Sequence, residues 1–503
     1  MVRHTFLLLA IISFAITLRA QVPDPSFGDQ GVMSFVHPES DTYFTDLVQE
    51  ASGRLIVVGY LDSIQTAHTG LVIAVNLDGT LDPNFAGDGV YTKFTPGSHN
   101  EYKRVALVPD GSGDIYASGN LKYPFGDYES MGVSKFLPNG NLATFNWEGS
   151  RVFNMSNCDG VIGYGAYVRP NGKILLYGSG NEGFAFNAVT TASIISTGQN
   201  DISFTDGTAQ TMVQLDGGSG ERAVDATVDQ SGRFLLAVNN EGTSWAIRLR
   251  ADGYRDYTFD NNNSAYYGYS GGAKRIGFWP DGKILLIGNS FQTPVMNGQV
   301  SRLIINGIPD ESFGEYGRRF YAWEENRNIY FTDYAWDPAG RLVIAGYQSP
   351  QFGSDGEGII VRLLPNGDPD PAFGTDGKYV VPHPAGYSNN SVAIGGNGRL
   401  FFIGSSDVSD TAYVSCYTTD LTTGLSPVQE RPVLRLWPNP ASSKLYVEGY
   451  HGTRPPRITN TLGQEVPLHA QRVGTGWELD VEGLAPGTYA ITGKGGTLLF
   501  LKE

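Results

Sequence analysis

The feature that most constrains this chain is a repeat with a step of fifty to sixty residues. A turn followed by an apolar run occurs seven times, and the turn glycines are Gly53, Gly113, Gly172, Gly232, Gly282, Gly340 and Gly398. Their successive spacings are 60, 59, 60, 50, 58 and 58 residues. Self-similarity at this period is typical of architectures in which each unit buries its apolar face against its neighbours.

A second element keeps the same step. A phenylalanine follows a turn once per repeat, in segments such as DPSFG and DPAFG. The seven positions are Phe27, Phe85, Phe145, Phe204, Phe259, Phe313 and Phe373. The glycine series and the phenylalanine series both give seven copies, so the repeat is not a chance pattern. We interpret the phenylalanine side chains as anchors between neighbouring units.

Each repeat contains four short strand-like segments. In the second repeat they are 103–109, 114–118, 132–137 and 150–154, separated by Asp-Gly and Asn-Gly turns. Runs such as KILLIG are apolar on consecutive residues, which indicates strands covered on both faces. Residues 21–426 are therefore predicted to form an all-β, seven-bladed β-propeller with four-stranded blades.

The phase of the repeats predicts how the ring closes. The last repeat ends with a third-type strand at 411–417, while the chain begins with an unmatched fourth-type strand at 31–36. We expect the N-terminal strand to complete the seventh blade, because this hides two sheet edges that would otherwise be exposed.

The D-x-x-F-G-x-x-G pattern followed by a DGKI-type hairpin resembles the delta-sixty repeat family of bacterial secreted and surface proteins. The resemblance covers about 21–418 and is strongest in repeats one, two, six and seven. It implies a fold and a location outside the cell, and no particular activity.

The composition narrows the choice of partners. The net charge is −16, with 35 basic and 51 acidic residues. Nucleic-acid binding requires clustered basic side chains that neutralise phosphates, so we expect no nucleic-acid partner. The same balance disfavours an anionic membrane surface.

The first twenty residues have the composition of a signal peptide. Arg3 supplies a positive start, an apolar stretch follows, and Ala20 is the small residue before a cleavage site at Gln21. The apolar run from Phe6 to Leu18 is too short, and too soon followed by polar sequence, to be a spanning helix, and we expect no membrane span in the mature chain.

The C-terminal residues are predicted to form a separate module. A linker at 427–433 precedes a β-sandwich at 434–503 with alternating strands and Gly/Pro turns. The ordered segments PNPA, TLGQEV and LAPGTY and a lysine near the end resemble the type A sorting domain of the Bacteroidota type IX secretion system. By that resemblance, the motif residues are Pro438, Asn439, Pro440, Gly463, Leu484, Gly487, Tyr489 and Lys502. The resemblance implies that the secretion machinery is a partner and that the protein is secreted or attached to the outer-membrane surface.

The chain contains no residue pattern for a cofactor or a metal. Its two cysteines, Cys158 and Cys416, lie in no CxxC or Cys/His cluster, and the sequence leaves open whether they pair. The aspartates of the repeated turns lack the spacing of a calcium loop and are interpreted as caps of backbone N–H groups. A G-x-S-x-G match at 268–272 precedes strand-type sequence rather than a helix, so we assign no catalytic residue.

Function is expected where the repeat is interrupted, because loops on a rigid scaffold carry binding residues. Four off-pattern loops combine aromatic and polar side chains: 122–131, 181–187, 260–270 and 321–330. This mix suits a non-catalytic binding or scaffold protein with a glycan or protein ligand. The alternative is a propeller enzyme acting on extracellular polysaccharide, with carboxylates drawn from Asp127, Glu129, Glu182, Glu324 and Glu325.

Overall fold

The structure is a computed structural model of the chain, and it describes residues 22–418, 435–437 and 439–503 with short internal gaps. The gaps are 64–65, 95–98, 123–128, 147–148, 154–159, 183–185, 214–219, 241–242, 260–263, 270, 353–355, 383–389, 407–409, 449–454, 461–463, 474–475 and 494–495. The chain divides into two compact units, Met1–Leu421 and Thr422–Glu503. The expected signal peptide, with Ala20 and Gln21, and the expected linker lie outside the described residues.

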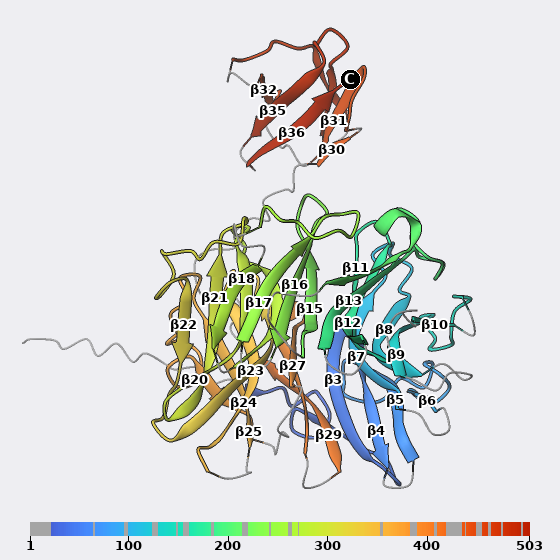
Figure 1. The fold of residues 1–503 in the computed structure, drawn as a ribbon, viewed down its shortest axis with the longest axis vertical. Helices are drawn as coiled ribbons and strands as arrows, with labels where there is room; N and C mark the ends of the chain where they lie inside the picture. The colour runs from blue at the N-terminus through green and yellow to red at the C-terminus, as the bar shows by residue number, and fades with distance from the viewer. Residues whose placement is uncertain are drawn as a thin grey trace, which may run out of the picture. The chain divides into compact units, whose positions relative to one another are not determined.

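The described strands of the first unit form seven sheets, in agreement with the seven repeats (Figure 1). Blade 1 contains β3 (Asp41–Gln49), β4 (Leu55–Ser63), β5 (Thr66–Val75) and β6 (Val90–Lys93). Blade 2 contains β7 (Glu101–Leu107), β8 (Ile115–Lys122), β9 (Glu129–Phe136) and β10 (Ser150–Phe153). Blade 3 contains β11 (Gly160–Val168), β12 (Ile174–Glu182), β13 (Phe186–Ile194) and β14 (Gln210–Val213).

The remaining blades repeat this order. Blade 4 contains β15 (Arg222–Val228), β16 (Phe234–Asn240), β17 (Thr243–Leu249) and β18 (Ser264–Tyr269). Blade 5 contains β19 (Gly272–Phe278), β20 (Ile284–Gln292), β21 (Val295–Leu303) and β22 (Arg318–Tyr321). Blade 6 contains β23 (Arg327–Trp336), β24 (Leu342–Pro350), β25 (Glu357–Leu363) and β26 (Lys378–Val380). Blade 7 contains β27 (Ser391–Ile394), β28 (Arg399–Ser405) and β29 (Thr411–Thr418), and the N-terminal strands β1 (Val22–Pro23) and β2 (Val32–Val36) join it.

The first strands of the blades form the inner ring. Each contacts the first strand of the next blade, from β3 through β7, β11, β15, β19 and β23 to β27, and β27 contacts β3 again. Helical structure in the described residues is limited to two 3-10 turns, Thr205–Gly207 and Gly396–Gly398. The all-β propeller expectation is therefore confirmed.

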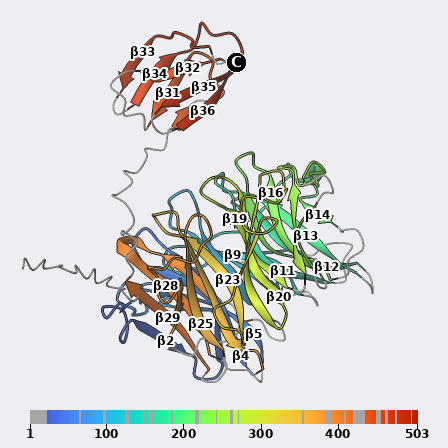
Figure 2. The same ribbon diagram turned by 90° about the vertical axis from the view of Figure 1, so that its left-hand side faces the viewer.

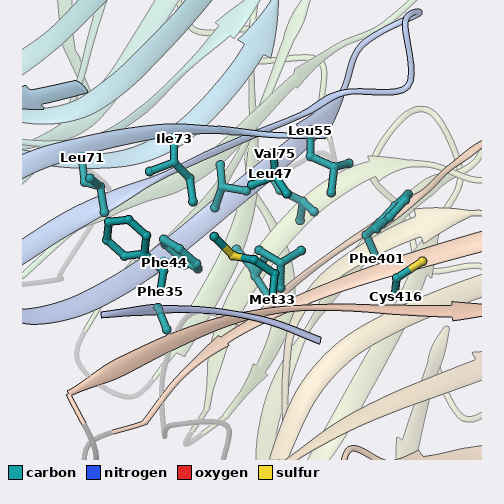
Figure 3. Close-up of a cluster of buried hydrophobic side chains, with 14 of the residues drawn as sticks. Met33, Phe35, Phe44, Leu47, Leu55, Leu71, Ile73, Val75, Phe401 and Cys416 are labelled. Atoms are coloured by element: carbon teal, nitrogen blue, oxygen red, sulfur yellow. The ribbon is translucent and has the colours of Figure 1, made fainter. Parts of the chain in front are cut away.

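The N-terminal strand closes the ring as the repeat phase predicts. Strand β2 pairs antiparallel with β29, with Val32 opposite Ser415 and Val36 opposite Thr411. Figure 2 shows the two strands side by side, although they come from opposite ends of the propeller sequence. In Figure 3, Met33 and Phe35 of β2 point into the same apolar cluster as Phe44. The closing strand therefore joins the core shared by blades 7 and 1.

The recurring turn glycines have a backbone reason. All seven have a positive φ, between 74° at Gly340 and 92° at Gly53, a conformation that costs glycine little because it has no Cβ. These turns reverse the chain between the first and second strands of each blade. The repeated glycine is thus a conformational requirement of the blade.

The recurring phenylalanines are interblade anchors, as the repeat suggests. All seven side chains have 0% exposure. Phe85 packs with side chains of blades 1 and 2, and Phe373 packs with side chains of blades 6 and 7. The residue after the phenylalanine also bridges repeats, since Ala86 donates its N–H to Asn139 O at 2.7 Å.

We expect Phe373→Ala to lower the free energy of unfolding by about 3–5 kcal/mol, because it leaves a cavity between two blades. The matched control is Phe352→Ala, whose ring is 87% exposed and whose loss should change stability by no more than about 0.5 kcal/mol. Equilibrium unfolding in urea measures both. Equal stabilities of the two variants would contradict the anchor role.

The second unit is a small β-sandwich. One sheet contains β30 (Arg435–Trp437), β31 (Lys444–Glu448), β34 (Gly476–Asp480) and β33 (Ala470–Val473). The other contains β32 (Arg457–Thr459), β35 (Gly487–Gly493) and β36 (Gly496–Lys502). Its core is formed by side chains of both sheets, including Leu445, Trp477, Ile491 and Phe500.

Candidate functional site

The inner strands share an irregularity that builds the centre of the propeller. In β3, β7, β11, β15, β19 and β23 the register shifts by one residue at the same point, which is a β-bulge. The residue after each bulge pairs with the second strand of its blade, and the paired position is equivalent in every blade. In β27, Ser391 occupies this position. We call these positions the central ring: Asp46, Arg104, Gly165, Asp225, Arg275, Asp333 and Ser391.

The three aspartates of the central ring connect neighbouring blades. Each carboxylate accepts the backbone N–H that follows the ring position of the next blade. The donors are Val105 to Asp46 at 3.0 Å, Ile276 to Asp225 at 2.8 Å and Val392 to Asp333 at 3.2 Å. Because these N–H groups lie at the propeller centre, the carboxylates satisfy donors that would otherwise be buried without partners.

The two arginines of the central ring balance these carboxylates. Arg275 Nε donates to Asp333 Oδ1 at 2.6 Å, and Arg104 Nε lies 3.8 Å from Asp225 Oδ1. Arg104 reaches across blade 3 because that blade has glycine at the ring position. A Cβ on Gly165 would lie 2.6 Å from Cγ of Arg104. The glycine therefore makes room for the ion pair.

A cavity of about 360 Å³ opens at the propeller centre, a size typical of small-ligand sites. Its lining comes from the inner strands of the blades, with two contributions from second strands. The residues are Thr45, Tyr60, Glu101, Lys103, Arg104, Tyr164, Arg222, Val224, Asn239, Ala273, Lys274, Arg275, Thr332 and Asn390. On each inner strand, a lining residue is either the ring residue itself or a residue that precedes it in the sequence. The cavity thus lies on the side of the central ring toward the N-terminal ends of these strands, and Arg104 and Arg275 of the ring line it.

One wall of the cavity carries a charged and aromatic cluster. His68 Nδ1 and Glu101 Oε1 lie 2.5 Å apart, and Lys103 Nζ lies 3.2 Å from Glu101 Oε2. Burial alone would raise the pKa of Glu101, but the hydrogen bond to His68 and the charge of Lys103 outweigh it and lower that pKa to about 2. The Tyr60 ring stacks on His68 at 4.7 Å between centroids. Glu101 is therefore a fixed carboxylate.

Two further cations line the cavity. Arg222 and Lys274 are solvent-exposed inside it, and in the described part of the chain neither has a hydrogen-bond or ion-pair partner. Surrounding protein and then the charges of Arg222 and Arg104 lower the pKa of Lys274. With Lys103, Arg104 and Arg275, the part of the lining that the structure describes holds five cations and one carboxylate, Glu101.

Neither this cavity nor its ring is visible in the sequence pattern, which favours function at the interrupted loops. Of these loops only 321–330 is fully described. There Tyr321 is buried, and the Trp323 indole N–H donates to Asp376 O at 2.9 Å. Both aromatic side chains are thus engaged in packing or hydrogen bonding.

The carboxylates named for an enzyme do not come together in the described part of the chain. Glu324 pairs with Arg327 at 3.1 Å and with Lys378 at 3.2 Å, while Glu325 is exposed. Asp127 and the side chains of Glu129 and Glu182 lie outside the described residues.

The turn aspartates cap backbone N–H groups, as expected. Asp82 Oδ1 accepts the N–H of Asn84 at 3.0 Å, and Asp370 Oδ1 accepts that of Ala372 at 2.9 Å. Within the described ranges, no three His, Cys, Asp or Glu side chains gather to hold a metal ion. Cys416 is a buried free thiol, and Cys158 lies outside the described residues.

Six of the eight residues named from the sorting-domain resemblance lie in the described part of the second unit. Asn439 Nδ2 donates to Leu499 O at 3.2 Å, and its Oδ1 accepts the Leu501 N–H at 2.9 Å, so the PNP segment is tied to β36. Tyr489 Oη donates to Ala485 O at 2.9 Å. The other described members are placed as follows: Pro440 is exposed, Leu484 packs on the sandwich core, Gly487 begins β35 and Lys502 is buried. Pro438 and Gly463 lie outside the described residues.

The central ring predicts a pH dependence of stability. Burial raises the pKa of Asp225 from 3.8 to about 6, despite Arg104 and the Ile276 N–H. Between these two values the folded chain holds a proton that the unfolded chain has lost, so stability falls as the pH rises through about 6. Between pH 4.5 and pH 7, the free energy of unfolding of the wild type should fall by about 2 kcal/mol more than that of Asp225→Asn. Urea unfolding at both pH values measures this, and parallel pH profiles would contradict it.

Comparisons with known proteins identify both units. Residues 50–85 and 338–373 match the domain of unknown function DUF5122, a β-propeller. Residues 435–501 match the secretion system C-terminal sorting domain. No curated protein matches the chain.

Three solved structures illustrate the structural similarity. Virginiamycin B lyase from Staphylococcus aureus is 11% identical, with 76% of this chain and 98% of that one covered, at a TM-score of 0.43. The arabinofuranosidase Arb93A from Fusarium graminearum is 10% identical over 80% and 97%, at a TM-score of 0.38. The β-propeller domain of the Trilobed protease from Pyrococcus furiosus is 9% identical over 79% and 99%, at a TM-score of 0.39. These similarities say nothing about a ligand or a reaction of this chain.

The two family matches fall on the two units that the structure separates. No helix in the described part of the chain has the length and apolar character that a membrane crossing requires. The chain carries DUF5122 β-propeller repeats and a type IX secretion-system C-terminal sorting domain, and it is a secreted or outer-membrane surface-attached protein.

Proposed function

We propose that this protein is a non-catalytic extracellular binding protein whose propeller holds its ligand in the central cavity. The observation that carries the proposal is the cavity itself, about 360 Å³ in volume and lined by polar and charged side chains. A cavity of this volume suits a small molecule or the end of a glycan chain. The sorting domain would deliver this site to the cell exterior.

The state of the carboxylates favours binding over catalysis. Glycoside hydrolysis uses one carboxyl group with a raised pKa as the acid and a second as base or nucleophile. In the lining, Glu101 has its pKa lowered to about 2 and is held by His68 and Lys103. The raised pKa values of Asp46, Asp225 and Asp333 belong to ring carboxyl groups that each hold a backbone N–H of the next blade. None of these three aspartates is among the residues that line the cavity, so none is placed to transfer a proton to a substrate there.

The mature chain, screened against a glycan array, tests the proposal, with product analysis on the same glycans. We expect retention of a glycan with no new reducing ends. Retention should fall when Thr332→Trp fills the cavity, while Ser34→Trp, at an exposed position of β2, should leave it unchanged. Release of shorter saccharides would show an enzyme, and retention that survives Thr332→Trp would place the site elsewhere.

A further inference from the structure

The cations of the cavity are unusual for this chain. The whole sequence has 35 basic and 51 acidic residues, yet among the described residues the lining has five basic side chains and one acidic one. Two of the five, Arg104 and Arg275, are matched by the ring carboxylates Asp225 and Asp333, and Lys103 is matched by Glu101. Arg222 and Lys274 remain without a partner among the described residues.

Leaving two cations unpaired in an enclosed site is unfavourable for the folded chain, because like charges repel and lose hydration. Both line the cavity, on the first strands of adjacent blades 4 and 5. A bound anion would relieve the repulsion. Groups that lower stability but face a cavity are typical of binding sites.

Neutral lining groups add a second chemical requirement. Asn390 Oδ1 is buried and accepts no hydrogen bond within the described residues, although its Nδ2 donates to Gly346 O at 2.8 Å. An unpaired buried acceptor costs free energy unless a ligand supplies a donor such as a hydroxyl. Tyr164 adds aromatic surface to the lining, whereas the ring of Tyr60 already stacks with both Tyr43 and His68.

We propose that the central cavity binds an acidic saccharide, with its carboxylate or sulfate held between Arg222 and Lys274 and a hydroxyl donated to Asn390. This inference rests on the proposed binding function and specifies its ligand class. The guanidinium of Arg222 presents parallel N–H groups that match a planar carboxylate or a sulfate, and Lys274 supplies a point charge.

The test uses isothermal titration calorimetry on the mature chain with a matched pair of probes. Tetragalacturonate carries carboxylates, and its fully methyl-esterified form has the same sugar chain without charge. A sulfated galacto-oligosaccharide tests the other anion source, and inorganic phosphate tests a free anion. We expect the acid or the sulfated oligosaccharide to bind at least about tenfold more tightly than the ester and the phosphate, since hydrogen bonds to charged groups are strong.

Variants separate binding from folding. Arg222→Gln and Lys274→Gln should each weaken acidic-saccharide binding at least about tenfold while keeping or raising the melting temperature, because each removes an unpaired charge. Arg250→Gln is the matched control, since Arg250 pairs with Asp252 on an exposed turn with 54% exposure.

Either of two results would overturn the anion assignment. In the first, neither acidic oligosaccharide binds more tightly than the methyl ester, and in the second, both cavity variants keep the wild-type affinity for the acidic oligosaccharide. Phosphate binding as tightly as the saccharides would overturn the saccharide assignment. Equal binding of acid and ester in the cavity would leave the proposed function standing, whereas cleavage of a probe would overturn the function itself.

Discussion

Deletion of residues 22–37 will abolish the cooperative unfolding transition of the propeller. The segment includes Phe27, Val32, Met33 and Phe35, which are all buried in the core. At about 2 kcal/mol for each buried apolar side chain, the loss is on the order of 8 kcal/mol. A whole domain is stable by only about 5–15 kcal/mol, so this N-terminal segment carries a large part of the total.

The same deletion also leaves β29 with a free edge. In the full chain, β2 pairs with this edge of β29, from Val32 opposite Ser415 to Val36 opposite Thr411, and so satisfies the backbone groups of β29 there. An uncovered apolar edge of this kind promotes association between chains. Differential scanning calorimetry and size-exclusion chromatography of the truncated chain should therefore show no sharp transition and a larger apparent mass.

Point variants in the same strand control for chain length. Phe35→Asp places a charge in the core and should reproduce the effect of the deletion, whereas Ser34→Asp, at the exposed neighbouring position, should melt like wild type. A truncated chain with the melting temperature of the full chain would show that the ring does not depend on its N-terminal strand.

Arg275→Met will lower the free energy of unfolding by about 3–5 kcal/mol. It leaves Asp333 as a buried carboxylate without its cation, after loss of the 2.6 Å bond from Arg275 Nε. The side chains of this pair are only 9% and 10% exposed, so water compensates little. Arg250→Met breaks a pair that is 54% and 49% exposed and should cost less than about 1 kcal/mol.

A double variant separates the charge from the hydrogen bonds. Arg275→Met with Asp333→Asn removes both charges, while the amide oxygen can still accept the Val392 N–H. It should be more stable than Arg275→Met alone, since no buried charge is left unpaired. Urea unfolding of the four proteins measures these differences. A single variant as stable as the Arg250→Met control would show that the central ring is not needed for stability.

The sequence predicts the scaffold well because the scaffold repeats in residue type. The turn glycines need positive φ in every blade, and an interblade phenylalanine such as Phe313 is needed in every repeat, so both elements recur visibly. The pairing of the N-terminal strand with the last blade is predicted from the phase of the repeats alone.

The site escaped prediction because it repeats in position and varies in residue type. The central ring residue stands seven positions before the turn glycine, as Asp46 does before Gly53, in every repeat except the second, where Arg104 stands nine before Gly113. Aligning the repeats on that glycine shows charged residues at the ring position in four of the seven blades, and the two-residue offset of the second repeat hides the fifth, Arg104. Which of them pair, and which cations stay unpaired, depends on contacts across the ring that no single repeat contains.

A crystal structure of the mature chain with tetragalacturonate is the most direct measurement of the central claim, that the closed ring holds a ligand at its centre. The account predicts seven sheets with β2 on β29 and a carboxylate within hydrogen-bond distance of Arg222 and Lys274. A saccharide bound to the outer loops, with the cavity holding only water, would contradict it.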